Sequence, residues 1–414
     1  MNPERIVITG MGTVNPIGHS VAETWRHALE GISGVGPITL FDASDLPVHI
    51  AAEVKNFDPE AFGLSRKEAR RMSRNQQFAL AAAREAITQA GLDTADLDPT
   101  RVGVLVSSAV GGLDALEQNI VALYQHGHRK VSPMVIPMLM VNGASGLIAI
   151  RYGFQGPALS IGSACASGID GLGLAWHLLQ AGVIDVAVAG GADATIDRSG
   201  VAAFDRTGAM SRRNEDYTLA PQPFDKDRDG LVMGEGAAVL ILERESHARA
   251  RGAPILAEMA GYAATADAYH ITAPHPQGDG AARAIRAALA AAGVAPQEVD
   301  YINAHGTGTR LNDATETLAI KQALQEHAYQ VPVSSTKSMT GHMMGATGAL
   351  EAIFCVQAIR EGVVPPTLHY QTRDPECDLD YVPNEPRPHA VRVALNNAFG
   401  FGGHNAVMVL RRYA

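Results

Sequence analysis

Short apolar runs alternate with amphipathic runs along almost the whole chain. Runs typical of buried strands occur first at 5–9, 102–107, 158–162, 186–189 and 237–242. Helical patterns lie between them at 21–30, 66–90 and 166–181. The longest helical pattern follows a capping box formed by Ser65 and Glu68 and ends at Gly91. Because strand and helix signals alternate, the sequence predicts layered α/β structure.

A second series of the same kind follows the first. It contains strand patterns at 255–263, 299–304, 331–334, 391–396 and 406–410, and helical patterns at 280–292, 313–325 and 345–360. Two strand-to-helix junctions correspond, one at Cys165 and one at Lys337 and His342. We therefore expect two related halves, 1–254 and 255–414, with an active site between them.

Composition narrows the class of protein. The chain has 414 residues, of which 46% are hydrophobic and 18% charged, as in globular proteins with a large core. Its net charge of −10 argues against a general binder of nucleic acid or anionic membranes. No uncharged apolar run reaches the roughly 20 residues that span a bilayer, and no signal peptide is visible. The three cysteines form no paired framework, so we expect a cytoplasmic protein.

Cys165 is the first candidate for chemistry. It lies where an apolar strand pattern gives way to a helix rich in glycine and alanine. Unpaired N–H groups and the positive end of the dipole at a helix start favour the thiolate form of cysteine. Taken alone, Cys165 fits a buried structural cysteine better than a nucleophile, because free cysteine packs well as a small hydrophobic residue. Two histidine segments change this balance.

His305 and His342 each follow a strand pattern and precede a helix. Polar groups at strand ends build the sites of open α/β sheets. Either histidine alone fits an ordinary turn residue. No second ligand stands three or four residues from His305, and no Cys-x-x-Cys is present, so we predict no metal site. One thiol and two imidazoles at such junctions favour covalent acyl transfer.

Several motifs together resemble a known family. They are Ser-Ala-Cys165-Ala-Ser-Gly, Asn-Ala-His305-Gly-Thr-Gly-Thr, Ser-Ser-Thr-Lys337-Ser-Met-Thr-Gly-His342 and Asn397-Ala-Phe-Gly-Phe-Gly-Gly403. In this order they resemble type II 3-oxoacyl-(acyl-carrier-protein) synthases and the related polyketide ketosynthases, over essentially the whole chain. The resemblance implies a thiolase-like fold of five layers, α-β-α-β-α, built from two duplicated halves.

The resemblance also implies roles for individual residues. Cys165 holds the acyl chain, and the backbone N–H groups of Cys165 and Phe401 form the oxyanion hole. His305 and His342 bind the malonyl thioester and stabilise the enolate left by decarboxylation. Lys337 and Glu351 support the histidines, with a purely structural ion pair as the alternative. No cofactor is expected to be bound, because acyl carrier protein brings its own phosphopantetheine.

The resemblance further predicts an acyl pocket and a docking patch. The acyl-pocket residues are Val110, Val135, Phe204 and Phe401. Val110 and Val135 are smaller than the isoleucine and phenylalanine common in the family, which indicates a roomier pocket unless Met134 or Met138 fills the space. The predicted carrier-protein residues are Arg66, Lys67, Arg70, Arg71, Arg74 and Arg206, and a merely solvated helix face is the alternative for this cluster. His404, where many members have threonine, predicts nothing about specificity.

The expected activity is decarboxylative condensation of a Cys165-bound acyl chain with malonyl-acyl carrier protein in fatty-acid elongation. The alternative is a discrete ketosynthase of a type II polyketide or polyene pathway. A non-catalytic chain-length factor is disfavoured because Cys165 is present. A degradative thiolase is disfavoured because that family uses a second catalytic cysteine. We expect a homodimer, with a heterodimer containing a chain-length factor as the alternative.

Overall fold

The computed structural model describes residues 4–414, and nine of its strands form one sheet. The spatial order is β4-β5-β6-β1-β7-β13-β12-β8-β9. The strands are β1 (Ile6–Val14), β4 (Val102–Ser107), β5 (Val186–Ala194), β6 (Glu235–Arg244), β7 (Ala257–Ala266), β8 (Tyr301–Asn303), β9 (Val333–Ser334), β12 (Val393–Gly400) and β13 (His404–Arg411). Only two residue pairs join β1 to β7, so the sheet divides there into two halves.

The two halves of the sheet have the same topology. In the first half, β4 is parallel to β5, β5 is antiparallel to β6, and β6 is antiparallel to β1. In the second half, β8 is parallel to β12, β12 is antiparallel to β13, and β13 is antiparallel to β7. This repeated pairing supports the predicted duplication.

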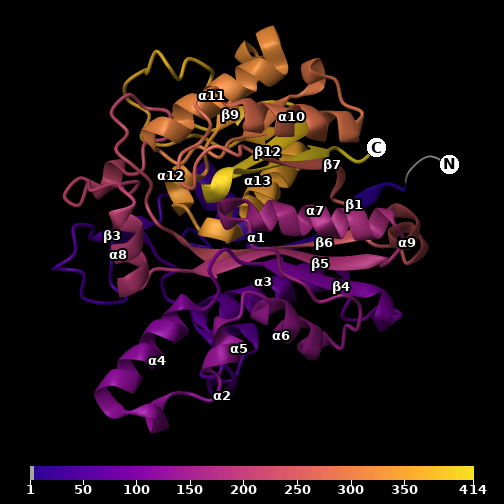
Figure 1. Ribbon diagram of the computed structural model, residues 1–414. Coiled ribbons are helices and arrows are strands. Elements are labelled where there is room, and N and C mark those ends of the chain that lie inside the picture. The colour runs from indigo at the N-terminus through magenta and orange to yellow at the C-terminus, as the bar shows by residue number, and fades with distance from the viewer. Residues whose placement is uncertain (1–3) are drawn as a thin grey trace.

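Helices cover both outer faces and fill the space between the halves (Figure 1). The inner pair, α7 (Ser167–Gln180) and α13 (Thr347–Glu361), approach closely because Gly168 lies against the backbone of Gly345 and Ala349. Helices α3 (Arg74–Ala90) and α6 (Gly143–Tyr152) cover the outer face of the first half. Helices α10 (Asp279–Ala292) and α11 (Arg310–Leu324) cover that of the second. The predicted five-layer α-β-α-β-α fold is confirmed.

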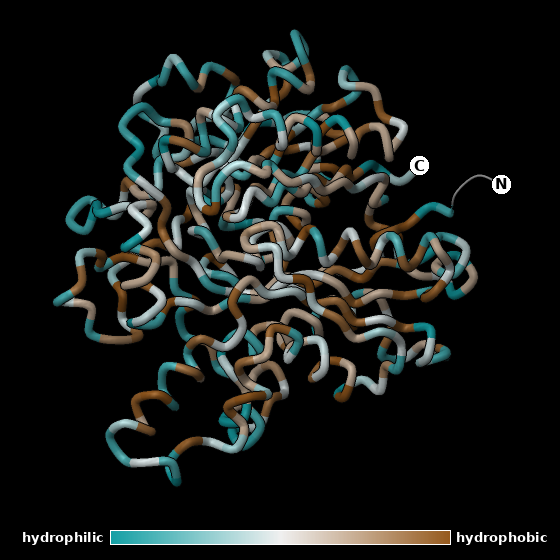
Figure 2. The backbone as a smooth tube through the Cα atoms, in the orientation of Figure 1, coloured by the Kyte–Doolittle hydropathy of each residue, from teal (hydrophilic) through white to brown (hydrophobic). Residues whose placement is uncertain are grey.

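The remaining elements are short or lie at the periphery. They are helices α1 (Val21–Leu29), α2 (Arg66–Ala69), α4 (Leu113–His126), α5 (Val135–Leu139), α8 (Arg198–Arg206), α9 (Glu245–Ala250) and α12 (Lys337–Thr340), and strands β2 (Val35–Pro37), β3 (Ile50–Ala52), β10 (Val363–Val364) and β11 (Arg387–Pro388). Helix α4 projects from the body yet carries several hydrophobic residues (Figure 2). Within residues 4–414, no helix is both long and apolar enough to span a bilayer.

Two predicted elements are wrong in detail. The single helix predicted at 66–90 is divided, because a new helix starts after Ser73, whose backbone N–H donates to Oε1 of Gln76 at 3.2 Å. Asp114 accepts a hydrogen bond from the backbone N–H of Arg74 and satisfies the new helix start. The capping box at Ser65 and the end at Gly91 are confirmed. The strand predicted at 158–162 is reduced to one bridge, between Ala158 and Val104 at the edge of the sheet.

Candidate active site

Cys165 lies in a strained turn at the start of α7. Its neighbour Ala164 has a φ of +50°, a left-handed conformation that non-glycine residues rarely adopt. Met344, just before α13, has a φ of +48° in the corresponding turn of the second half. A short 3₁₀ turn links each of these residues to its helix. The turn at Ala164 directs the Cys165 side chain into the space between the two halves.

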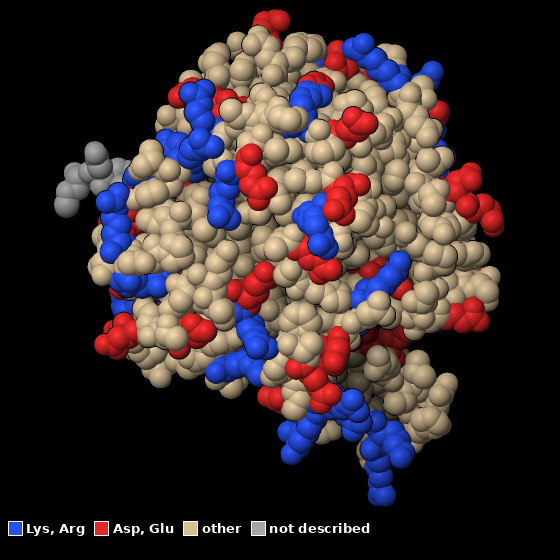
Figure 3. Space-filling model, turned by 180° about the vertical axis from the view of Figure 1, so that it is seen from behind, with Lys and Arg blue, Asp and Glu red and all other residues tan. Residues whose placement is uncertain are grey.

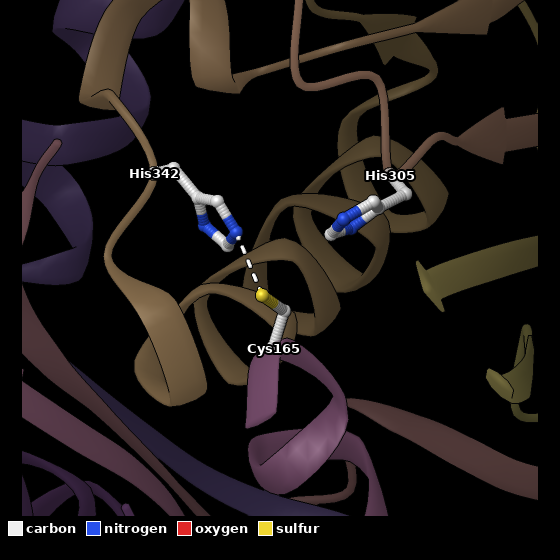
Figure 4. Close-up of side chains that lie close together, drawn as sticks. All are labelled: Cys165, His305 and His342. Atoms are coloured by element: carbon white, nitrogen blue, oxygen red, sulfur yellow. Dashed lines mark hydrogen bonds between the residues drawn. The ribbon is translucent and has the colours of Figure 1, made fainter. Parts of the chain in front are cut away.

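The fold brings Cys165, His305 and His342 together (Figure 4). Nε2 of His342 lies 3.1 Å from Sγ of Cys165. The imidazole rings of His305 and His342 are nearly perpendicular, with centroids 5.4 Å apart. His305 follows β8, and His342 follows α12, so both histidines come from the second half and the thiol comes from the first.

Burial controls the protonation of the thiol. It raises the pKa of Cys165 to about 11, although the Lys337 charge and the backbone N–H groups of Phe401 and Cys165 favour the thiolate. This corrects the expectation that the helix start would hold Cys165 as a thiolate, because loss of water outweighs the favourable partners. At neutral pH the thiol is protonated and needs a base.

His342 is placed to be that base. Burial, with a smaller contribution from the Lys337 charge, lowers the pKa of His342 well below its usual range, so the imidazole is neutral. Its Nδ1 lies 3.1 Å from Oγ1 of Thr347. If Nδ1–H donates to Thr347, the Nε2 lone pair faces the thiol. His342 can then accept the Cys165 proton, a role that the sequence reasoning missed because it assigned His342 to malonyl alone.

The pKa of Cys165 predicts how the thiol reacts with a small reagent. Its alkylation by iodoacetamide should keep accelerating from about pH 7 to pH 10, because the reactive thiolate fraction grows about tenfold per pH unit below the pKa. Mass spectrometry of the labelled peptide measures the rate. The fully buried Cys355 and Cys377 are internal controls that should not react. A plateau near neutral pH would instead indicate a preformed thiolate.

A buried ion pair lies behind the histidines. Nζ of Lys337 lies 2.5 Å from Oε1 of Glu351, and both side chains are 1% exposed. Burial lowers the pKa of His305 well below its usual range, and the charges of Lys337 and of a protonated His342 would lower it further. The pair places a positive charge where it keeps the imidazoles neutral. This is consistent with the support role expected of Lys337 and Glu351.

The glycine-rich loop after β12 lies against the nucleophile. A Cβ on Gly400 would come within 2.9 Å of the Cys165 backbone nitrogen, so only glycine permits this approach. The backbone N–H of Phe401 favours the thiolate form of Cys165, which indicates that it points toward the sulfur. This arrangement is suited to an oxyanion hole formed by the N–H groups of Cys165 and Phe401.

Two buried carboxylates that the sequence reasoning missed hold the loops of the site. Glu316 accepts hydrogen bonds from the backbone N–H groups of His305 at 2.8 Å and Gly306 at 2.7 Å. Asp193 accepts from the N–H groups of Ala109 at 2.9 Å and Gly345 at 2.7 Å. The sequence did offer a signal for both residues. Asp193 lies inside an apolar strand and Glu316 lies on a buried helix face, and a buried carboxylate needs hydrogen-bond partners inside the protein.

A cavity of about 510 Å³ opens beside the three reactive groups. Its walls include Cys165, His305, His342, Phe204 and Phe401. Val110 and Val135 do not line this cavity, so their acyl-pocket role stays a prediction. His404 is exposed at the start of β13, with its ring against Gly402, and these contacts assign it no role in specificity.

The basic residues of the predicted docking patch are divided by the structure. Arg66, Lys67, Arg70 and Arg71 are exposed on and just after α2, and Arg206 is exposed at the end of α8. Arg74 is a correction, because its guanidinium hydrogen-bonds both carboxylate oxygens of Glu235 at 2.7 Å and is not free to bind a partner. Lysine and arginine gather on the lower end of the molecule in Figure 3, over α2 and the end of α4.

Comparisons with known proteins agree with this geometry. The N-terminal domain of the beta-ketoacyl synthase family matches residues 3–248, and its C-terminal domain matches residues 256–371. The chain is 50% identical to 3-oxoacyl-(acyl-carrier-protein) synthase 2 of Synechocystis sp. over 413 residues, covering 100% of this chain and 99% of the relative. It is 47% identical to the protein of that name from Staphylococcus aureus, covering 99% of each chain.

Solved structures give the same result. A type II polyketide ketosynthase, solved with its acyl-carrier protein and a hexaketide, is 35% identical with a TM-score of 0.93, covering 100% of both chains. A beta-ketoacyl synthase from Burkholderia phymatum is 33% identical with a TM-score of 0.92, covering 99% of this chain and 100% of the other. With a thiol and two neutral imidazoles between two matching halves, and with relatives along its full length, the chain belongs to the beta-ketoacyl synthase family.

Proposed function

We propose that the protein condenses an acyl chain held on Cys165 with malonyl-acyl carrier protein, giving 3-oxoacyl-acyl carrier protein in fatty-acid elongation. The observation that carries this proposal is the neutral His342 imidazole 3.1 Å from the protonated Cys165 thiol, with His305 in the same cavity. No bound cofactor is required, because the carrier protein brings both acyl groups on phosphopantetheine.

The first step transfers the acyl chain to Cys165. Nε2 of His342 takes the thiol proton as sulfur attacks the thioester carbonyl of acyl-carrier protein. The N–H groups of Cys165 and Phe401 stabilise the oxyanion that forms. The carrier thiolate then leaves and takes a proton from His342, which returns the imidazole to its neutral form.

The second step forms the carbon–carbon bond. Malonyl-carrier protein enters the cavity, and the two imidazoles donate hydrogen bonds to its thioester carbonyl. His342 donates from Nε2–H in its second neutral tautomer, in which the Thr347 hydroxyl donates to Nδ1. Loss of carbon dioxide leaves an enolate, whose negative oxygen these donors stabilise. The enolate carbon attacks the Cys165 thioester, and the Cys165 thiolate leaves and takes up one proton from solvent, which restores the resting thiol. The product is longer by two carbons.

Sequence identity favours the fatty-acid pathway over the polyketide alternative. The chain is 50% and 47% identical to proteins named 3-oxoacyl-(acyl-carrier-protein) synthase 2, but 35% and 38% identical to solved type II polyketide and ishigamide ketosynthases. The test is incubation of the purified protein with saturated acyl-carrier proteins of increasing length and malonyl-carrier protein. Mass spectrometry should detect saturated 3-oxoacyl products two carbons longer. Turnover confined to poly-β-keto or polyene primers would overturn the fatty-acid assignment.

The carrier protein is proposed to dock at the basic end of the molecule. Arg66, Lys67, Arg70 and Arg71 present positive charge on α2 and the turn after it, and Arg129 and Lys130 are exposed just after α4. In a chain of net charge −10, this local positive patch suits the acidic surface of acyl carrier protein. Arg206 is included in the proposal, and Arg74 is excluded.

Reversing the charge of Arg66, Lys67 and Arg70 together should raise the KM for acyl-carrier protein at low salt, because electrostatic steering is lost. The rate of Cys165 alkylation by iodoacetamide should not change. A matched control reverses Arg283 and Arg286 on α10, at the opposite end of the molecule. An unchanged KM in the α2 variant would show that the patch is only solvated.

We propose a homodimer built on the exposed apolar surface of α4 to α6. Tyr124 is 86% exposed, Ile136 is 61% exposed and Ile150 is 80% exposed. The segment after Ala158 lies at the edge of the sheet, and its only β bridge within the described residues is to β4. A second copy of the chain would cover this edge and the exposed apolar side chains, since exposed apolar patches mark interfaces. Light scattering should give twice the chain mass of 43.6 kDa. A monomer would favour a heterodimer with a chain-length factor.

The unpaired state of Cys165, Cys355 and Cys377 supports a reducing compartment, and we propose the cytoplasm.

A further inference from the structure

The three reactive side chains also form a compact set of metal-binding donors. Sγ of Cys165 and one ring nitrogen each of His305 and His342 all lie within 4.8 Å of one another. Thiolate and imidazole are the ligands that Zn²⁺ prefers. The spacing along the sequence had argued against a metal here, but the ligands converge from three separate segments of the fold.

Both imidazoles are ready to act as ligands. Metals bind imidazole nitrogens, and both rings line the cavity beside the Cys165 sulfur. The hydrogen bond between Nδ1 of His342 and Thr347 resembles the outer contacts that orient metal-bound histidines. His305 is 3% exposed, and its Nδ1 has no hydrogen-bond partner within the described residues. One buried donor nitrogen is therefore unused.

The distances require only a small adjustment. Zn–S and Zn–N bonds in a tetrahedral site place the ligand atoms about 3.5 Å apart. The Cys165–His342 pair is already at 3.1 Å, so closing the set needs a shift of about 1 Å at His305. The cavity beside the three side chains leaves the fourth position open to water.

We propose that Zn²⁺ binds reversibly to Cys165, His305 and His342 of the unacylated protein and blocks the site. Binding forms a Zn–S bond, and the thiol proton leaves to the buffer. No electron is transferred. The nearby Lys337 charge opposes a cation but is paired with Glu351, so we expect a site that a chelator empties readily. An acylated Cys165 has no thiolate to offer, so metal and acyl chain exclude each other. Only this last point rests on the proposed function.

Co²⁺ added to chelator-treated protein tests the site directly. A thiolate-to-cobalt charge-transfer band should appear in the near ultraviolet and saturate at one Co²⁺ per chain. About one proton should be released per metal in weak buffer. Zn²⁺ should displace Co²⁺ and abolish the band. Absence of the band, or release of no proton, would overturn the proposal.

Variants identify the ligands. Cys165→Ser should abolish the charge-transfer band, and His305→Gln or His342→Gln should weaken Co²⁺ binding at least tenfold. Cys377→Ser is the matched control, because Cys377 is buried away from the cavity, and it should retain the band. Circular dichroism confirms that each variant is folded. A band that persists in Cys165→Ser would place the metal elsewhere.

A second readout separates this proposal from the proposed function. Zn²⁺ should protect Cys165 from iodoacetamide, and a chelator should restore its reaction. Failure to condense acyl groups would leave the cobalt band and this protection unchanged. Loss of both with condensation intact would overturn the metal site alone.

Discussion

Replacement of Cys165 by alanine should abolish the acyl-enzyme. No other thiol can substitute, because Cys355 and Cys377 are fully buried and do not line the cavity. Mass spectrometry of the protein after incubation with acyl-carrier protein measures the adduct. Unchanged adduct stoichiometry in the alanine variant would mean that another residue is the nucleophile.

A companion variant separates the two steps. Cys165→Gln imitates an acylated cysteine in shape, so it should lose condensation while keeping decarboxylation of malonyl-carrier protein. His305 and His342, which act on malonyl, stay in place in this variant. Carbon dioxide release measures the retained step. If the glutamine variant releases no carbon dioxide, the division of roles between the thiol and the imidazoles is wrong.

Removal of either histidine should slow condensation on the order of 100- to 1000-fold, because one donor to the enolate oxygen is lost. The structure predicts a further difference between the two. His342→Ala should also slow acylation of Cys165, since Nε2 of His342 lies 3.1 Å from the sulfur. His305→Ala should acylate at a rate near that of the parent protein.

Rapid-quench measurement of the acyl-enzyme separates the two variants from each other. Each should be compared with His369→Ala, a half-buried histidine outside the cavity whose ring contacts the backbone of Pro221. Equal acylation rates in the His305 and His342 variants would remove His342 as the base for the first step. Normal condensation in either variant would remove that histidine from the mechanism.

Local sequence signals predicted most of the helices and strands. The predictions failed where residues distant in the sequence determine the structure. The capping box at Ser65 and the end at Gly91 follow from neighbouring residues and are confirmed. The break before α3 depends partly on Asp114, which is 40 residues away in the sequence. The segment after Ala158 has the composition of a strand but pairs with a neighbouring strand through only one bridge within the described residues. No local sequence pattern reveals this lack of pairing.

The same limit applies to the site. Motif order was enough to single out Cys165, His305 and His342, which the fold brings together. The protonation of Cys165 was misjudged because a helix start is visible in sequence, whereas burial from both halves is not. Arg74 looks like part of a basic cluster in sequence, but its partner Glu235 lies 161 residues away.

The two strained turns, at Ala164 and Met344, have a consequence for how many nucleophiles the fold can hold. Since Ala164 corresponds to Met344, Cys165 corresponds to Gly345. A side chain at Gly345 would meet Asp193 at 2.7 Å, so the second turn has no room for a nucleophile. Two identical subunits would have to carry the same residue at both turns. A single chain that holds both turns can carry a reactive side chain at one and glycine at the other.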